Sequence, residues 1–153
     1  MSQLLEMLGC RYPIIQGPIG AMNSPALVAA ISEAGAYGLL ALGFIRDIDE
    51  AKRILDGVRE LTDRPFGANL MIINPLNEQL VPVLARAGVK TVTTSVGSPE
   101  KIYPLIHDHG MKGLHVLLAL QHAIKAERSG ADGIVVAGSE AGGLRSTSPE
   151  SST

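Results

Sequence analysis

The sequence has one cysteine, Cys10, no tryptophan and only five phenylalanine and tyrosine residues. A single cysteine excludes an internal disulfide and a cysteine-rich metal site. Acidic and basic residues nearly cancel, and no run of Lys or Arg is present, so there is no charge pattern for nucleic acid. No apolar run is long enough to span a membrane, and the N-terminal segment lacks the features of a secretory signal. These absences predict a cytoplasmic protein with neither a nucleic-acid nor a membrane partner.

Short aliphatic runs recur along the chain, separated by amphipathic segments. The runs are rich in Ile, Val and Leu and hardly alternate between apolar and polar residues. This pattern is typical of parallel strands that are covered on both faces. The predicted strands are residues 13–16, 37–42, 66–73, 90–94, 112–118 and 133–137.

The five segments between these runs have the start and stop signals of helices. Ser24 followed by Pro25 is typical of a helix start, and Gly35 is a suitable stop for that helix. Asp47 followed by Glu50 resembles a capping box at the start of the next helix. Six strands with five helices between them form a βα array, which closes as a barrel or opens as a doubly wound sheet.

The loop after the first run favours the barrel. A dinucleotide-binding open sheet has a G-x-G-x-x-G loop there, whereas this chain places Pro18 where such a loop offers a backbone N–H. The predicted fold class is therefore α/β, a (β/α)8 TIM barrel. Because a complete barrel has eight strands in about 250 residues, we expect a truncated barrel of about six strands over residues 1–145.

The last residues, 146–153, are almost without apolar side chains and predict a disordered tail. An array that stops after six strands would expose two apolar edges. We therefore expect either a second copy of the chain to cover these edges in a homo-oligomer or the polypeptide to be a truncated product.

Four regions of the chain, in order, resemble one enzyme family. They are RYPIIQGPIG at residues 11–20, PFGANL at 65–70, TTSVGSP at 93–99, and HAIKAE, GADG and EAGG between 122 and 143. These motifs resemble nitronate monooxygenases, formerly called 2-nitropropane dioxygenases, and the related flavin-dependent enoyl-acyl-carrier-protein reductases. The resemblance covers almost all of residues 4–145. It implies a barrel that binds FMN at the C-terminal ends of its strands, where barrel enzymes place their active sites.

The resemblance also implies which residues contact the flavin ring. The first loop leaves the barrel at the active-site face, and its glycines let a flat ring approach the backbone; an ordinary Gly-Pro turn is the alternative. Asn69 is the one strongly polar side chain in its strand and has donors and an acceptor for a ring edge; the alternative is an amide that bonds to neighbouring backbone. The implied contacts in the first loop are Gln16, Gly17, Pro18, Ile19 and Gly20.

Further candidates lie at the ends of later strands. Thr94 ends a strand and has a hydroxyl for a ligand or for the local backbone. His115, in an apolar run, is the catalytic candidate by resemblance, and a satisfied core histidine is the alternative. Many relatives have Lys where this chain has Val116. The glycine-rich turn with Gly138, Gly142 and Gly143 could form part of a phosphate-binding nest, or a flexible loop.

Leu144 departs from the family, because many relatives that oxidise nitronates have His after EAGG. Leucine cannot accept a proton, so neutral nitroalkanes, which must first lose one, are disfavoured as substrates. Alkyl nitronates, already ionised, need no such base. The resemblance therefore implies an FMN-dependent oxidoreductase that oxidises alkyl nitronates with O2. No cluster of His, Asp and Glu has the spacing of metal ligands, so we expect no metal. The alternatives are a flavin-dependent enoyl-thioester reductase that uses a reduced nicotinamide, and a non-catalytic fragment that binds FMN weakly.

Overall fold

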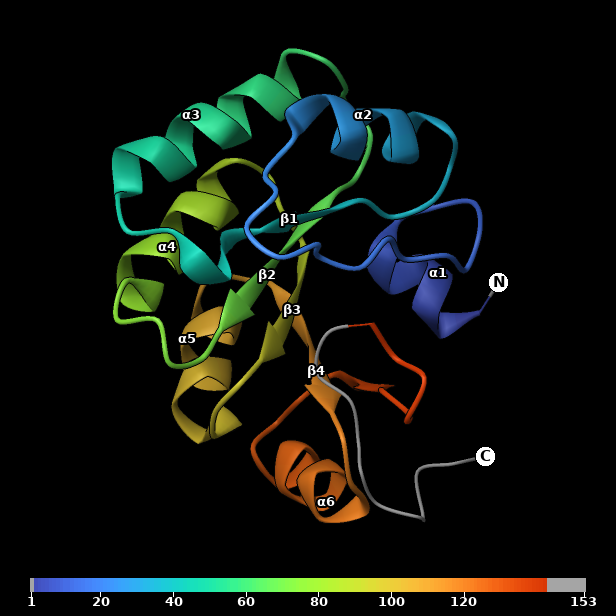
Figure 1. The fold of residues 1–153 in the computed structure, drawn as a ribbon, viewed down its shortest axis with the longest axis vertical. Coiled ribbons are helices and arrows are strands. Elements are labelled where there is room, and N and C mark those ends of the chain that lie inside the picture. The colour runs from blue at the N-terminus through green and yellow to red at the C-terminus, as the bar shows by residue number, and fades with distance from the viewer. Residues whose placement is uncertain (1, 143–153) are drawn as a thin grey trace.

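The computed structural model describes residues 2–142, which contain a parallel sheet flanked by helices (Figure 1). The sheet has the sequential order β1-β2-β3-β4-β5, and each neighbouring pair is parallel. The sequential parallel array predicted from the sequence is thus confirmed. The strands are β1 Leu39–Ala41, β2 Gly67–Met71, β3 Thr91–Ser95, β4 Lys112–Leu117 and β5 Gly133–Val136.

The first predicted strand, residues 13–16, differs from the prediction because it forms only an isolated parallel bridge between Ile15 and Tyr37. Tyr37 N donates to Ile14 O and Gln16 N donates to Tyr37 O, each at 2.9 Å. The chain then turns away at Gly17, and the proline that follows has no N–H to continue a ladder. Five of the six predicted runs therefore form strands, and the first lies beside β1 as a short edge.

The helices follow the predicted pattern. α2 begins after Ser24, whose Oγ accepts from Leu27 N at 3.2 Å, and α3 begins after Asp47, whose carboxylate accepts from Asp49 N at 3.0 Å. These side chains satisfy N–H groups that have no partner within the helix. The helices are α1 Gln3–Leu8, α2 Pro25–Glu33, α3 Ile48–Arg59, α4 Asn77–Arg86, α5 Ile102–Asp108 and α6 Leu120–Arg128, with 3-10 turns at Leu42–Phe44 and Pro99–Lys101.

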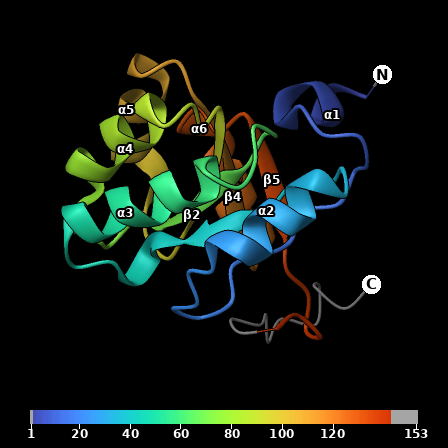
Figure 2. The same ribbon diagram turned by 90° about the horizontal axis from the view of Figure 1, so that it is seen from above.

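The two faces of the sheet bury different side chains. One face, called here the helix face, packs Leu40, Leu70 and Val92 against the helices α3, α4 and α5 that line one side of the sheet in Figure 1. The opposite face, called here the inner face, buries Leu39 and Leu114 in a second, smaller cluster with Leu8 of α1. Figure 2 shows α1 standing apart from α3, α4 and α5. Side chains that alternate along each strand therefore have different neighbours.

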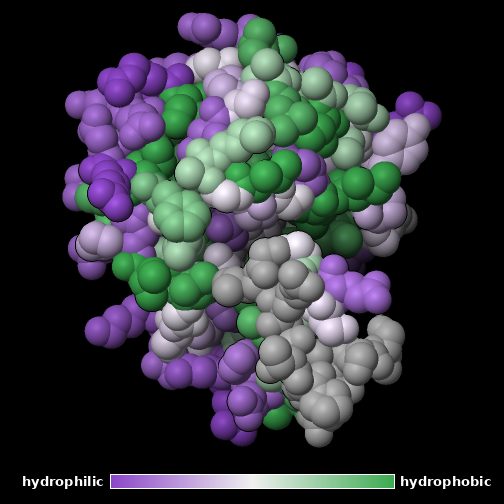
Figure 3. Space-filling view, viewed as in Figure 1, coloured by the Kyte–Doolittle hydropathy of each residue, from purple (hydrophilic) through white to green (hydrophobic). Residues whose placement is uncertain are grey.

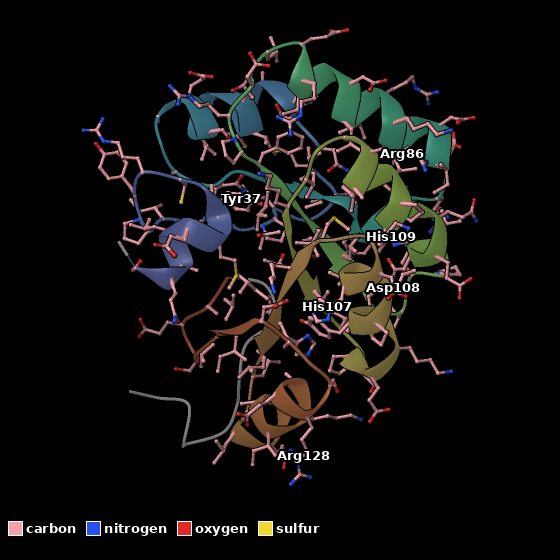
Figure 4. The ribbon with its side chains drawn as sticks, turned by 180° about the vertical axis from the view of Figure 1, so that it is seen from behind. Tyr37, Arg86, His107, Asp108, His109 and Arg128 are labelled. Atoms are coloured by element: carbon pink, nitrogen blue, oxygen red, sulfur yellow. The ribbon has the colours of Figure 1, made fainter. Side chains whose placement is uncertain are left out.

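The N-terminal end of the inner face is closed by Tyr37. Its hydroxyl lies 2.7 Å from Thr91 O and 3.1 Å from Phe66 O, and the side chain is labelled in Figure 4. A Cβ added to Gly67 would lie 2.6 Å from Thr91 O and 2.7 Å from the Tyr37 ring, so only glycine fits there. Since α1 also accepts a hydrogen bond from Thr91 Oγ1 at Met7 O, 2.8 Å away, this end of the sheet is well packed.

No helix within residues 2–142 is long and apolar enough to cross a membrane. Hydrophobic residues do reach the surface in several patches (Figure 3). On the edge strand β5, Ile134 and Val136 are 48% and 66% exposed. The predicted covering of this edge by a second copy of the chain stays a prediction.

Candidate functional site

The first loop is held at the C-terminal end of β1 by Asn23. Asn23 Nδ2 donates to Ala41 O at 3.2 Å, and Ala41 N donates to Asn23 Oδ1 at 2.8 Å. Because Ala41 is the last residue of β1, this pair places residues 16–23 at the carboxyl edge of the sheet. Asn23 was not among the site residues predicted from the sequence. The only feature of the sequence that could have indicated this role is the position of an amide side chain directly before the helix start at Ser24.

The predicted contact residues of this loop form an open surface. No atom lies within 4 Å of a Cβ built on Gly17 or on Gly20, and Gly20 has a φ of +54°. Pro18 and Ile19 are exposed, Ile19 to 54%. Gln16 Nε2 donates to Gly17 O, while Gln16 Oε1 is buried without a hydrogen-bond partner among the described residues. The loop therefore has an unsatisfied acceptor beside an uncovered stretch of backbone.

Asn69 lies next to this loop on the inner face. It pairs in register with Ala41 on one side and Thr93 on the other. Asn69 Nδ2 donates to Thr93 Oγ1 at 2.9 Å, and its Oδ1 accepts from Ser95 Oγ at 3.3 Å. The side chain is 5% exposed, so these bonds offset the cost of burying the amide. One N–H and one lone pair of the amide remain available.

Thr94 and His115 lie on the helix face instead. They are register partners, and Thr94 Oγ1 lies 2.9 Å from His115 Nδ1 and 3.0 Å from the hydroxyl of Tyr103 on α5. Burial lowers the pKa of His115, assisted by the nearby His122, and burial raises the pKa of Tyr103 to about 12. Both groups are therefore neutral near pH 7. This placement beneath α5 favours a packing role for Thr94, and the catalytic role of His115 stays a prediction.

The glycine-rich turn follows β5 at the same edge of the sheet. Ala137 N donates to Leu117 O at 3.0 Å, and Ala141 N donates to Gly138 O at 3.3 Å, which closes the turn. A Cβ on Gly142 would meet nothing within 4 Å. Gly138 and Gly142 thus belong to an open turn at the carboxyl end of β5. Gly143 and Leu144, and the predicted tail at 146–153, lie outside the described residues.

The loop after β3 contains a strained residue that the sequence did not reveal. Val96 has a φ of 52°, a region that β-branched residues rarely adopt. Its carbonyl accepts from Ile73 N at 3.2 Å, and a Cβ on the following Gly97 would lie 2.8 Å from Ile72. Such strain is often found at functional sites. Among the described residues, no group of three His, Cys, Asp or Glu side chains could hold a metal ion.

This chain is similar to several known proteins. The family profile described as nitronate monooxygenase matches residues 1–80. A nitronate monooxygenase from Paraburkholderia phytofirmans is 29% identical over 181 aligned positions, covering 93% of this chain and 49% of that protein. The (3aS,4S,5R,7aS)-5-hydroxy-7a-methyl-1-oxo-octahydro-1H-indene-4-carboxyl-CoA dehydrogenase of Mycobacterium tuberculosis is 29% identical over 142 positions, covering 93% and 40%.

The structure of FabK from Thermotoga maritima superimposes with a TM-score of 0.85 at 31% identity, covering 96% of this chain and 48% of that one. The match confirms the predicted barrel class, in which the described strands form one arc. The chain spans about half the length or less of these relatives. Since the family profile covers more than half of the 153 residues, the chain belongs to the nitronate monooxygenase family.

Proposed function

We propose that this chain contributes the flavin-ring side of an FMN-dependent oxidoreductase that oxidises alkyl nitronates with O2. The observation that carries the proposal is that the open loop at residues 16–20, which is followed by the Asn23–Ala41 hydrogen-bond pair, and Asn69, the register partner of Ala41, both lie at the carboxyl edge of the sheet. Parallel-barrel enzymes bind their ligands at this edge. Membership of the nitronate monooxygenase family supports the same assignment.

The residues at this edge fit a flavin ring. Gln16 Oε1 is buried without a partner among residues 2–142 and would accept a ring N–H, and the free N–H and lone pair of Asn69 suit the alternating donors and acceptors of a ring edge. The uncovered backbone at Gly17 and Gly20 leaves space for a flat ring. Bound FMN would take electrons from the substrate and pass them to O2, while the protein orients both partners. The turn with Gly138 and Gly142 would contribute amides to the phosphate.

The polar groups of the inner face suit a substrate that is already ionised. Within the described part of the chain, the side chains at this edge are amides and hydroxyls, namely Asn69, Thr93 and Ser95. None of them has a pKa that suits proton abstraction near neutral pH. His115, which could accept a proton, belongs to the helix face. A nitronate needs no deprotonation, whereas a neutral nitroalkane does, so we propose the nitronate as the substrate.

A second candidate is an oxidoreductase that acts on acyl thioesters. The relative from M. tuberculosis is named a carboxyl-CoA dehydrogenase, and it matches 93% of this chain. The inner-face site does not distinguish the two candidates, because the flavin ring would be held in the same way. The reaction partners do distinguish them.

The experiment supplies the chain with saturating FMN and compares two reactions. The first is O2 uptake driven by an alkyl nitronate, with the parent nitroalkane as the control. The second is NADH consumption driven by an enoyl-CoA. We expect O2 uptake with the nitronate and little with the nitroalkane. NADH consumption that depends on the enoyl-CoA, without nitronate oxidation, would overturn the proposal in favour of the thioester reductase. No flavin-dependent turnover with either substrate pair would overturn both.

A further inference from the structure

We infer that the structure contains a second binding pocket, outside the flavin site, for a small aliphatic carboxylate. The pocket lies over the carboxyl ends of β3 and β4, beside α6, and has a volume of about 310 Å³. Ligand pockets commonly begin at about this size. The pocket shares Ser95 with the polar groups of the inner face but no lining residue with the first loop or Asn69, and it does not depend on the proposed flavin chemistry.

The wall of the pocket is mostly apolar. Val96, Pro99, Val116, Leu117 and Leu118 supply aliphatic side chains from the loop after β3 and from the end of β4. A short hydrocarbon chain that displaces water from such a wall binds favourably, by about 25 cal/mol for each Å² buried. The strained backbone of Val96 forms part of this wall. A purely polar ion such as phosphate would leave these surfaces unused, so we favour a ligand with an aliphatic part.

The buried end of the pocket presents one ring nitrogen of His115. The residue is 5% exposed, and its Nδ1 edge faces Thr94 Oγ1, which also contacts the Tyr103 hydroxyl. No hydrogen bond to Nε2 is present within residues 2–142, and His115 lines the pocket. The two hydroxyls fix the ring in place, so Nε2 is the nitrogen left for a ligand. A ring nitrogen that has no protein partner and lines a pocket favours a ligand that can bond to it.

Two basic side chains on α6 complete the lining. His122 and Lys125 lie one turn apart on the helix, as residues i and i+3, and both line the pocket. Lys125 Nζ is 3.4 Å from Glu100 Oε1, but both side chains are about half exposed or more. An exposed pair of this kind is weak, so a carboxylate can take the place of Glu100. Glu100 is absent from the pocket lining, which contains no acidic side chain. An anion with an aliphatic chain therefore matches both the charge and the apolar wall.

The test uses hexanoate as the probe and follows the imidazole signals of the full 153-residue chain by NMR. We expect saturable shifts of the His115 and His122 signals and a rise in the pKa of His115, because a bound anion stabilises the charged ring. His107 and His109, which bond to Asp132 and to Leu105 O, are internal controls and should not shift. Hexanol, with the same chain and no charge, should bind about tenfold more weakly.

Matched variants separate a specific pocket from general anion binding. Lys125→Gln should weaken hexanoate binding about fivefold, the effect of about 1 kcal/mol. Lys101→Gln removes the same charge from a residue outside the pocket lining and should change the affinity less than twofold. Native-like amide spectra would show that both variants fold. Equal losses in the two variants, equal binding of hexanol, or no shift of His115 at millimolar hexanoate would each overturn the inference.

Discussion

Asn23 and Ala41 form a closed pair of hydrogen bonds that holds the first loop on the end of β1. Asn23→Ala would leave the partly buried Ala41 N–H and C=O without their partner, so we expect the free energy of unfolding to fall by about 1–3 kcal/mol. Asn23→Asp keeps the acceptor and loses the donor, so its loss should be smaller. Urea denaturation measures both. Equal stabilities of the wild type and the Ala variant would show that the loop is held by other contacts.

The substitution Thr94→Val tests whether Thr94 stabilises the packing of the helix face or contributes to flavin binding. The substitution removes the hydroxyl between His115 Nδ1 and the Tyr103 hydroxyl, and leaves both of these buried groups without that partner. We expect the free energy of unfolding to fall by about 1–3 kcal/mol, with the affinity for flavin unchanged. A flavin titration and a denaturation curve on the same variant check this. Weaker flavin binding without loss of stability would show instead that Thr94 contributes to the cofactor site, as the sequence predicted.

Asp132 forms hydrogen bonds both to the N-terminal end of β4 and to α5. Its carboxylate accepts from Lys112 Nζ and Gly113 N at 2.8 Å and from His107 Nε2 at 2.9 Å, and His107 is labelled in Figure 4. Burial raises the pKa of Asp132, but the bonds from Lys112, Gly113 and His107 together outweigh it, so the pKa lies below its usual value.

Because the pKa is lowered on folding, Asp132 stabilises the protein above the unfolded pKa of about 4, and this contribution is lost as the pH falls through the folded value. We expect Asp132→Asn to be less stable than the wild type at pH 7 by about 1–3 kcal/mol. The difference should shrink as the pH is lowered below 4. Asp108→Asn, an exposed acidic residue of α5, is the control. A difference that does not depend on pH would rule out a charge effect.

Two glycines make a matched pair. Gly67→Ala would place its Cβ 2.6 Å from Thr91 O, which is backbone and cannot move aside, so we expect a loss of about 3 kcal/mol or more. Gly17→Ala meets nothing within 4 Å and should change the stability by less than about 0.5 kcal/mol, while weakening flavin binding by blocking the close approach of the ring. Thermal unfolding and flavin titration measure the two effects. A stable Gly67→Ala variant would contradict the packing at Tyr37.

The sequence predicted the order of the elements because each signal was local. Apolar runs without alternation marked β2, β3, β4 and β5, and Ser24 with Pro25 marked the start of α2. The first run was predicted as a full strand but forms a single bridge, because the break at Gly17 depends on where the chain must turn in space. The length of this strand depends on tertiary contacts, which cannot be inferred from the pattern of apolar residues.

The site was only partly predictable for a similar reason. Asn69 and the first loop were selected because a polar residue and glycines stood at strand ends. Thr94 was selected because it ends a strand, and His115 was selected by resemblance to the family, yet they follow Thr93 and Leu114 by one residue and therefore face the helices. A shift of one residue reverses the face of a strand, and a run without apolar–polar alternation does not reveal which face is which. Asn23 was missed because its partner, Ala41, is distant in sequence.

The proposed flavin-ring site is tested most directly by mapping the binding of riboflavin on the NMR amide spectrum of the chain. Riboflavin has the flavin ring without the phosphate, so its shifts report the ring contacts alone, and FMN should gain only modest affinity over it from the turn at Gly138 and Gly142. We expect the shifts to be concentrated at residues 16–20 and at Asn69, and the affinity to fall at least fivefold in Asn69→Leu. Shifts that gather elsewhere, or an affinity unchanged in Asn69→Leu, would contradict the proposed site.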